Sequence, residues 1–290
     1  MWNSKEIRTN LNEKDGFAER FQRDGLLIVE NAFNDEEMKL IEAAYQGNLD
    51  NPSPLAQNLY SEEGGTFIQS VEDSSNKPAF RAMFEGTPIV EICAKVFGSG
   101  GVWYFHDQLF YKDGGKKSVR RTPWHQDTPY HAIDGSKFVV FWIPMHDVSD
   151  ESALEVVRGS HNQTLYNPSF FDPNDDTLPL YDEKEMPRLP HIEPEREKWD
   201  IMTCGAKRGD LLIFHPSCLH GGGPTPTGST RRSLSLRMVG DDIVRVTRPT
   251  ADLDSPTANN IGDDEEELTA RINKLPLGTP VFEAGLNQLT

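Results

Sequence analysis

The segment KFVVFWIPM, residues 137–145, is a strongly apolar strand candidate that decides the class of fold. Its β-branched and aromatic residues favour a buried β-strand. Similar short segments recur from Val102 onward, separated by turn sequences such as KDGGKK (112–117). They are VWYFHDQLFY (102–111), ALEVVRGSH (153–161), GDLLIFHP (209–216) and RRSLSLRMVG (231–240). Many short strands with turns between them predict a mainly β domain with flanking helices, a jelly roll.

The part of the chain before Val102 predicts mainly helices. Phe17 and Phe21 lie four residues apart in EKDGFAERFQRDG, which favours a short amphipathic helix that ends at Gly25. A buried strand, LLIVENAF, follows, and Asn34 is placed to cap the helix DEEMKLIEAAYQ. We then expect a loop over 47–76, which is rich in Pro, Gly and Ser, and a helix in two pieces around Pro88.

We therefore expect one domain spanning 1–290. It would have a helical N-terminal part (about 1–100), a jelly-roll core (about 101–245) and a peripheral acidic C-terminal tail. Residues 166–200 form an insertion in which aromatic residues alternate with acids and prolines. A loop of this length in a compact domain is usually functional or disordered, so we expect either a lid over the site or a disordered surface excursion.

Charge and composition restrict the partners. The 29 Lys and Arg residues against 46 Asp and Glu residues give a net charge of −17, which argues against nucleic acid and anionic membranes. A small anionic ligand remains compatible, because a few local cations dominate inside a pocket. The three cysteines form no CxxC pair, and the polar start and the absence of a long apolar run predict a cytoplasmic protein. The oligomeric state is open, and a homodimer is allowed.

The segment TPWHQDTPYH, residues 122–131, contains the first candidate for chemistry. Side chains two apart on a strand share a face, so His125 and Asp127 can reach one ion. A single HxD triplet is weak evidence. His220 is the best third ligand, because it ends a strand before three glycines, whereas His215 on that strand would face the opposite way. Two histidines and one carboxylate make a facial triad for iron.

A cation is needed if the iron site uses a keto acid. Arg231 and Arg232 follow His220 by eleven and twelve residues, and by strand alternation only one of them points inward. Arginine suits the task, because its planar fork binds a carboxylate through two hydrogen bonds. The alternative is that both arginines lie on a solvated strand.

Taken together, the chain resembles the phytanoyl-CoA dioxygenase family of Fe(II)- and 2-oxoglutarate-dependent oxygenases from about Phe21 to Asp242. The resemblance rests on FQRDGLLIVENAF, WHQD, FWIPMHDVSDESALEVVRGSH, GDLLIFHPSCLHGG and RRSLSLRM, in that order. It implies a double-stranded β-helix, the cupin-like jelly roll, with Fe(II), 2-oxoglutarate and O₂.

The resemblance also implies site residues. His125, Asp127 and His220 match the iron ligands, and Arg231 matches the arginine that holds the far (C5) carboxylate of 2-oxoglutarate. The other positions that resemble co-substrate contacts are Trp142, Gln108, Lys77 and Thr128. Some members carry a hydroxyl two residues after the second histidine; this chain has Gly222 there, with Ser233 as a polar substitute.

The expected function is oxidation, in the simplest case hydroxylation, of an unactivated C–H bond in a small metabolite or natural product, with release of succinate and CO₂. Asp127 argues against the related halogenases, which leave this position without a carboxylate. The basic stretch KKSVRR (116–121) favours a solvated turn over an anion site, and the acidic chain is a poor host for acyl-CoA. A zinc hydrolase using the same triad and a non-catalytic jelly-roll binding protein are the alternatives.

Overall fold

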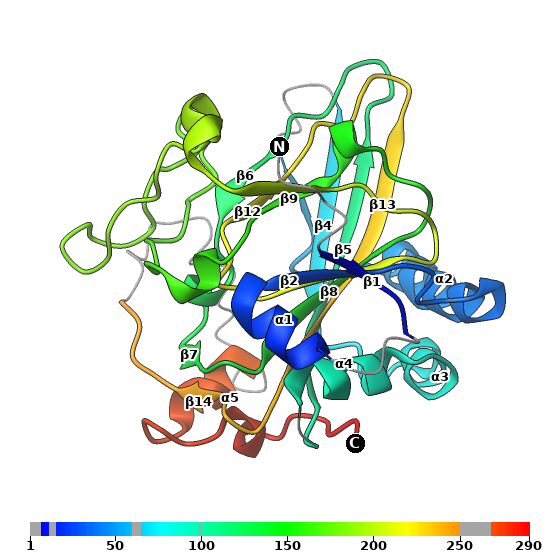
Figure 1. Ribbon diagram of the computed structural model, residues 1–290, viewed down its shortest axis with the longest axis vertical. Helices are drawn as coiled ribbons and strands as arrows, with labels where there is room; N and C mark the ends of the chain where they lie inside the picture. The colour runs from blue at the N-terminus through cyan, green and yellow to red at the C-terminus, as the bar shows by residue number, and fades with distance from the viewer. Residues whose placement is uncertain (1–6, 12–15, 60–64, 99, 250–267) are drawn as a thin grey trace.

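Two β-sheets form the centre of the computed structural model, which describes residues 7–11, 16–59, 65–98, 100–249 and 268–290 (Figure 1). The larger sheet has eight strands in the order β1-β2-β11-β8-β13-β5-β4-β3. Their bounds are β1 Arg8–Thr9, β2 Leu26–Val29, β11 Leu211–Phe214, β8 Phe138–Pro144, β13 Thr230–Val239, β5 Trp103–Asp113, β4 Thr66–Glu72 and β3 Gln57–Asn58.

The smaller sheet contains four strands in the order β10-β9-β12-β6, and a third sheet pairs β14 with β7. The bounds are β10 Ile201–Cys204, β9 Leu154–Val157, β12 His220–Gly222, β6 Thr122–His125, β14 Val244–Arg245 and β7 Ile133–Asp134. The two main sheets share an apolar core, in which Trp142 of β8 packs in one cluster with Val156 and Met202. The predicted mainly β, cupin-like jelly roll is confirmed.

Strand β8 shows how the sequence builds these layers. Its residues are buried on both faces, so the strand is apolar throughout. Phe141 and Ile143 belong to the core under the helices, whereas Val140 and Trp142 belong to the core between the sheets. The period of two residues in a strand thus separates a helix-covered face from the face that carries the site.

The helices cover the outer face of the larger sheet, with α2 and α3 on the side opposite the 160–200 segment (Figure 1). Their bounds are α1 Phe17–Asp24, α2 Asp35–Asp50, α3 Pro78–Gly86 and α4 Ile89–Phe97. The predicted helix end at Gly25 is confirmed, and its φ of 73° is one that glycine adopts without strain. The Asn34 cap is confirmed as a capping box with Glu37, and Pro88 separates α3 from α4 as predicted.

The predicted loop over 47–76 is wrong in part. Helix α2 continues to Asp50, and β4 (Thr66–Glu72) pairs antiparallel with β5 over its whole length. The strand TFIQSVE is amphipathic rather than continuously apolar. Its stability comes from long-range pairing with β5, which local composition does not reveal.

The insertion at 166–200 is described throughout and lies between β9 and β10. It contains the 3₁₀ helix η6 (Glu193–Lys198) and an isolated bridge between Ser169 and Pro179. The buried Asn167 side chain accepts a hydrogen bond from the Tyr181 backbone and donates one to the Tyr181 carbonyl. These bonds close the segment on itself.

The acidic stretch of the tail, residues 252–267, lies outside the described residues. The described part of the tail contains α5 (Leu268–Lys274) and η8 (Val281–Ala284), and it is not peripheral. Ile272 and Val281 are buried in a small core with Phe105, and Phe282 stacks on Trp103 at 4.5 Å between ring centroids. The prediction of a peripheral tail is therefore wrong here, because its apolar residues cover one end of the sheet.

All three cysteines are buried free thiols, as expected. Among the described residues, no helix combines the length and apolar character needed to cross a membrane.

Candidate functional site

His125, Asp127 and His220 lie together in the interior, with one potential ligand atom from each within 4.8 Å of the others. Asp127 Oδ1 lies 3.4 Å from His125 Nε2 and 3.7 Å from His220 Nε2. The histidines are brought together by pairing of β6 with β12, in which His125 and His220 are direct partners. Residues far apart in the sequence therefore form a three-atom group of metal-binding character.

Both histidines present Nε2 toward this group. His125 Nδ1 lies 2.8 Å from the Pro123 carbonyl oxygen, and His220 Nδ1 lies 2.9 Å from that of Cys218. Because a carbonyl oxygen only accepts, each Nδ1 carries the proton and each Nε2 keeps a free lone pair. Burial, then His125, lower the pKa of His220 to about 3, which keeps its ring neutral. The donor set fits a divalent metal such as Fe(II).

The local backbone differs from the expected strand pair. His125 is the last residue of β6, whereas Asp127 has helical dihedrals and precedes the short 3₁₀ helix η3 (Thr128–Tyr130). A turn therefore places the carboxylate beside the histidines. His220 opens β12, and His215 follows β11 in another sheet, so the prediction that these two histidines share one strand is also wrong.

Asp127 is held in its ionised form by a residue that sequence reasoning missed. Arg237 on β13 donates to Asp127 Oδ2 from Nη2 at 2.6 Å and from Nε at 3.2 Å. Burial alone would raise the pKa of Asp127, but Arg237 and the two histidines hold it well below its usual range. The sequence signal was available, because Arg237 follows Arg231 by six residues and so shares its face of the strand.

Arg231 is buried and lines the same cavity as the triad. Its Nη1 donates to the Ser152 carbonyl at 2.5 Å, and its Nε has no hydrogen-bond partner among the described residues. Arg232, by contrast, is half-buried and does not line the cavity, as strand alternation predicts. Gly222 makes room for the guanidinium: a Cβ there would lie 3.2 Å from Arg231 Nη1. The Ser233 hydroxyl is buried and likewise lacks a partner among the described residues.

Lys112 is a second missed residue near Arg231. It is the direct partner of Arg231 across β5 and β13, and it is fully buried. Its Nζ donates to Thr122 Oγ1 at 2.8 Å and lies 4.0 Å from the centre of the Phe67 ring. Burial and then Arg231 hold the pKa of Lys112 well below its usual range. Arg231 at the cavity wall thus has a second basic residue as its cross-strand partner, although Lys112 itself does not line the cavity.

The remaining predicted co-substrate residues divide into two groups. Trp142 and Gln108 line the cavity, and the Gln108 amide donates to Gln69 at 2.9 Å. Thr128 is buried but accepts a hydrogen bond from Ser217 and does not line the cavity. Lys77 does not reach the triad, because its ammonium pairs with Glu72 at 2.7 Å and donates to Asn48 at 2.8 Å.

Two other histidines have structural surroundings. His161 Nε2 lies 3.0 Å from the Gln22 carbonyl, so it ties its turn to α1. His215 is buried and accepts a hydrogen bond from the Ser217 backbone at 3.1 Å. Neither residue lines the cavity, so both hold the fold together rather than contribute to the site.

The cavity has a volume of about 1020 Å³ and lies between the two main sheets. The insertion and α5 also contribute to its wall. Phe171 of the insertion lies edge-on to His125, with ring centroids 5.1 Å apart, and stacks on Tyr130. Its φ of 57° is unusual for a bulky residue. The insertion therefore holds an aromatic ring against a candidate metal ligand despite backbone strain.

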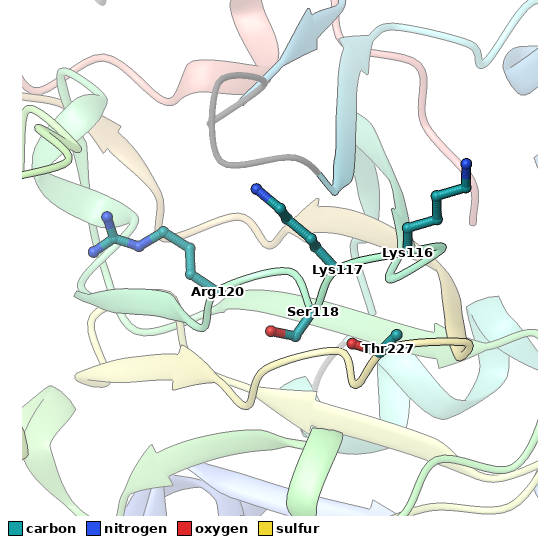
Figure 2. A pocket seen from close by; sticks show the side chains of 5 residues that line it. All are labelled: Lys116, Lys117, Ser118, Arg120 and Thr227. Atoms are coloured by element: carbon teal, nitrogen blue, oxygen red, sulfur yellow. The ribbon is translucent and has the colours of Figure 1, made fainter.

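The KKSVRR stretch lines a separate shallow pocket, shown in Figure 2. The charged ends of Lys116, Lys117 and Arg120 are spread apart there rather than converging on one point. Arg120 is engaged with Asp176 of the insertion at 2.6 Å. These contacts favour the predicted solvated turn over an anion site.

Comparison with known proteins agrees with this geometry. A family model described as phytanoyl-CoA dioxygenase (PhyH) matches residues 21–233. A Caenorhabditis elegans protein named probable phytanoyl-CoA dioxygenase is 22% identical over 247 residues, which are 78% of this chain and 75% of that protein.

Two solved structures share the fold. The epimerase SnoN, in complex with Fe3+, alpha ketoglutarate and nogalamycin RO, has a TM-score of 0.66 and 18% identity, over 94% of this chain and 97% of that chain. EctD from S. alaskensis, with 2-oxoglutarate and 5-hydroxyectoine, has a TM-score of 0.56 and 20% identity, over 81% and 83%.

The match to the family model, together with the buried His-Asp-His group, identifies the class of Fe(II)- and 2-oxoglutarate-dependent oxygenases. The chain belongs to the phytanoyl-CoA dioxygenase family. It is a dioxygenase, an oxidoreductase that uses Fe(II), 2-oxoglutarate and O₂, as the sequence motifs predicted.

Proposed function

We propose that this dioxygenase hydroxylates a C–H bond of a small metabolite or natural product, with His125, Asp127 and His220 as its iron ligands. The observation that carries the proposal is the convergence of three ligand atoms within 4.8 Å at the wall of a cavity that also contains a buried arginine. When bound, Fe(II) and 2-oxoglutarate supply O₂ activation coupled to oxidative decarboxylation of the keto acid.

The triad leaves the opposite side of the metal position free for small ligands, as a facial arrangement requires. The Pro123 and Cys218 carbonyls fix the two imidazole rings, so little reorganisation is needed when a metal binds. A zinc hydrolase would find the same ligands, but it has no use for the buried arginine at the cavity wall.

Arg231 would anchor the far carboxylate of 2-oxoglutarate, and Lys112, its cross-strand partner, would add positive potential behind it. A buried guanidinium and a buried amine opposite each other are unfavourable without an anion between or beside them. A dicarboxylate relieves this repulsion. Trp142, which lines the cavity, supplies an apolar surface for the carbon chain.

Residues 166–200 would act as a lid. Phe171 and Tyr181 bring aromatic surface to the cavity wall, and Tyr181 Oη donates to the Pro129 carbonyl at 3.2 Å beside η3. An apolar cover next to the metal position excludes water from the reacting atoms. The co-substrate fills only part of about 1020 Å³, which leaves room for a small multi-ring or polar substrate.

Succinate release tests this proposal. Purified protein should form succinate and CO₂ from 2-oxoglutarate only with Fe(II) and O₂, and a metabolite library should contain compounds that stimulate release. Asp127→Ala should abolish the stimulation, with Asp50→Ala at the exposed end of α2 as a control carboxylate. Turnover that needs zinc but neither Fe(II) nor 2-oxoglutarate would reject the proposal in favour of a hydrolase. Unaltered ligand binding in Asp127→Ala without any turnover would favour a binding protein.

A further inference from the structure

A second polar cluster lies beside the triad, on the side away from Arg231. Arg237 of β13 and His106 of β5 are direct cross-strand partners, and both line the cavity. His131, just after η3, lies 5.5 Å from His106 between ring centroids. Arg237 is 5% exposed and His106 is 9% exposed, so both polar groups are built into the interior.

Arg237 decides which oxygen of Asp127 faces the histidines. Its Nη2 and Nε both donate to Oδ2, whereas Oδ1 is the oxygen 3.4 Å from His125 Nε2. The guanidinium therefore occupies one carboxylate oxygen and leaves the other as a single ligand atom. Asp127 is thereby prepared to bind a metal through Oδ1 alone.

The far edge of the same guanidinium has no partner in the described part of the chain. Arg237 Nη1 is buried and makes no hydrogen bond to the described residues, and the same is true of His106 Nε2. His106 Nδ1 lies 3.4 Å from the Asp107 carbonyl oxygen, so the proton belongs on Nδ1 and Nε2 is an acceptor. Burial and then Arg237 hold the pKa of His106 well below its usual range, which keeps the ring neutral.

An unpaired buried donor and an unpaired buried acceptor on adjacent strands call for a partner that supplies both functions. A hydroxyl group does so, because its oxygen accepts from Arg237 and its proton is donated to His106. A protonated amine would leave Arg237 Nη1 without an acceptor. A carboxylate would leave His106 Nε2 without a donor.

We propose that Arg237 and His106 form a hydroxyl-binding subsite next to the metal position, so that the substrate is an alcohol oxidised at a neighbouring carbon. This inference rests on the proposed function. Arg237 has two roles in this proposal. It positions Asp127, and it contacts the substrate oxygen. The other source of an oxygen at this position is the near (C1) carboxylate of 2-oxoglutarate.

The positioning part is tested by metal affinity without turnover. Calorimetric titration with Co(II) under argon should show about 10–100-fold weaker binding for Arg237→Met, the usual range when a partner of a metal ligand is removed. Arg237→Lys, which retains a donor, should recover part of the loss. His106→Phe and the control Arg232→Met should bind Co(II) as the wild type does. Equal affinity in Arg237→Met would overturn the positioning role.

The subsite is tested with protein loaded with Zn(II) and 2-oxoglutarate, which cannot turn over. Cyclohexanol and trans-1,2-cyclohexanediol, each paired with its deoxy analogue, are titrated by ligand-observed NMR. Wild type should bind the alcohols at least about tenfold more tightly than the analogues, and His106→Phe should lose this preference. No preference in wild type, including binding of neither partner, overturns the subsite, as does a preference that survives in His106→Phe.

A third experiment asks whether the unpaired groups bind the near carboxylate of 2-oxoglutarate instead of the substrate. It measures the 2-oxoglutarate affinity of the Co(II)-loaded proteins. Unchanged affinity in His106→Phe assigns the subsite to the substrate, as proposed. A fall in that affinity assigns the unpaired groups to the near carboxylate instead and overturns the proposal. Failure of the wild type to bind both metal and 2-oxoglutarate would refute the proposed function itself, which separates the two outcomes.

Discussion

Lys112 and Arg231 lie directly opposite each other on β5 and β13, and both basic side chains are buried. Burial lowers the pKa of Arg231 to about 10, and burial followed by Arg231 holds the pKa of Lys112 well below its usual range. Like charges across a strand pair destabilise a sheet. A bound anion would favour the charged form of both groups, and Arg231 of this pair lies at the wall of the cavity that holds the triad.

Substituting Arg231 tests the anchor. We expect Arg231→Met to weaken 2-oxoglutarate binding by about 2–5 kcal/mol, because a charged hydrogen-bonded contact in a desolvated pocket is lost. Arg232→Met, on the other face of β13, should change it little. Anaerobic titration of the Co(II)-loaded proteins with 2-oxoglutarate measures both. A larger loss in Arg232→Met would show that Arg232, and not Arg231, serves the cavity.

Substituting Lys112 should have opposite effects on stability and binding. Lys112→Met removes a buried amine and retains most of the volume, so the ligand-free protein should gain about 1–4 kcal/mol in the free energy of unfolding. Its affinity for 2-oxoglutarate should fall. Urea denaturation and the same titration give the two values. A loss of stability with unchanged affinity would make Lys112 a purely structural residue.

Phe171 should control the coupling of co-substrate consumption to substrate oxidation. Phe171→Gly relieves a strained backbone, which is worth about 1–3 kcal/mol, but removes the ring against His125. We expect little change in Tm and more succinate formed per oxidised product, because water reaches the metal position. Phe170→Ala, beside it on the lid, is the comparison. Tight coupling in Phe171→Gly would contradict the lid role.

The metal-free protein should lose stability as the pH falls below about 6.5. Burial lowers the pKa of His131 to about 4 and that of His215 to about 3, so both stay neutral in the fold while the unfolded chain takes up their protons. Burial raises the pKa of Asp107 to about 7, which opposes the trend by one proton.

The net effect of these three groups is about one proton, which corresponds to about 1.4 kcal/mol per pH unit near pH 5.5. Urea denaturation at pH 7.5, 6.5 and 5.5 with a chelator present measures it. Asp107→Asn should steepen the loss, because it removes the opposing group. Constant or rising stability toward pH 5.5 would contradict the assigned protonation states.

The residues of the site that the sequence predicted correctly are those marked by a local sequence pattern. The HxD triplet, the glycines after His220 and the parity of Arg231 against Arg232 are visible within a few residues. Strand β8 was equally visible, because a strand buried on both faces is apolar at every position.

The rest depends on contacts between distant strands. Lys112 and His106 acquire their roles through register with β13, and no local feature of VWYFHDQLFYK reveals that register. Strand β4 was missed for the same reason. A strand was expected over residues 125–127, but a turn carries Asp127 to the histidines. The three residues still meet, because either backbone conformation brings side chains two positions apart to one side.

The central claim is that His125, Asp127 and His220 bind one ferrous ion while Arg231 holds the keto acid. A crystal structure obtained anaerobically with Fe(II) and 2-oxoglutarate tests it most directly, with anomalous scattering recorded at the iron edge. We predict a single strong anomalous peak bounded by His125 Nε2, Asp127 Oδ1 and His220 Nε2, with the far carboxylate of 2-oxoglutarate on the Arg231 guanidinium. Iron bound elsewhere, or a keto acid that does not contact Arg231, would contradict the account.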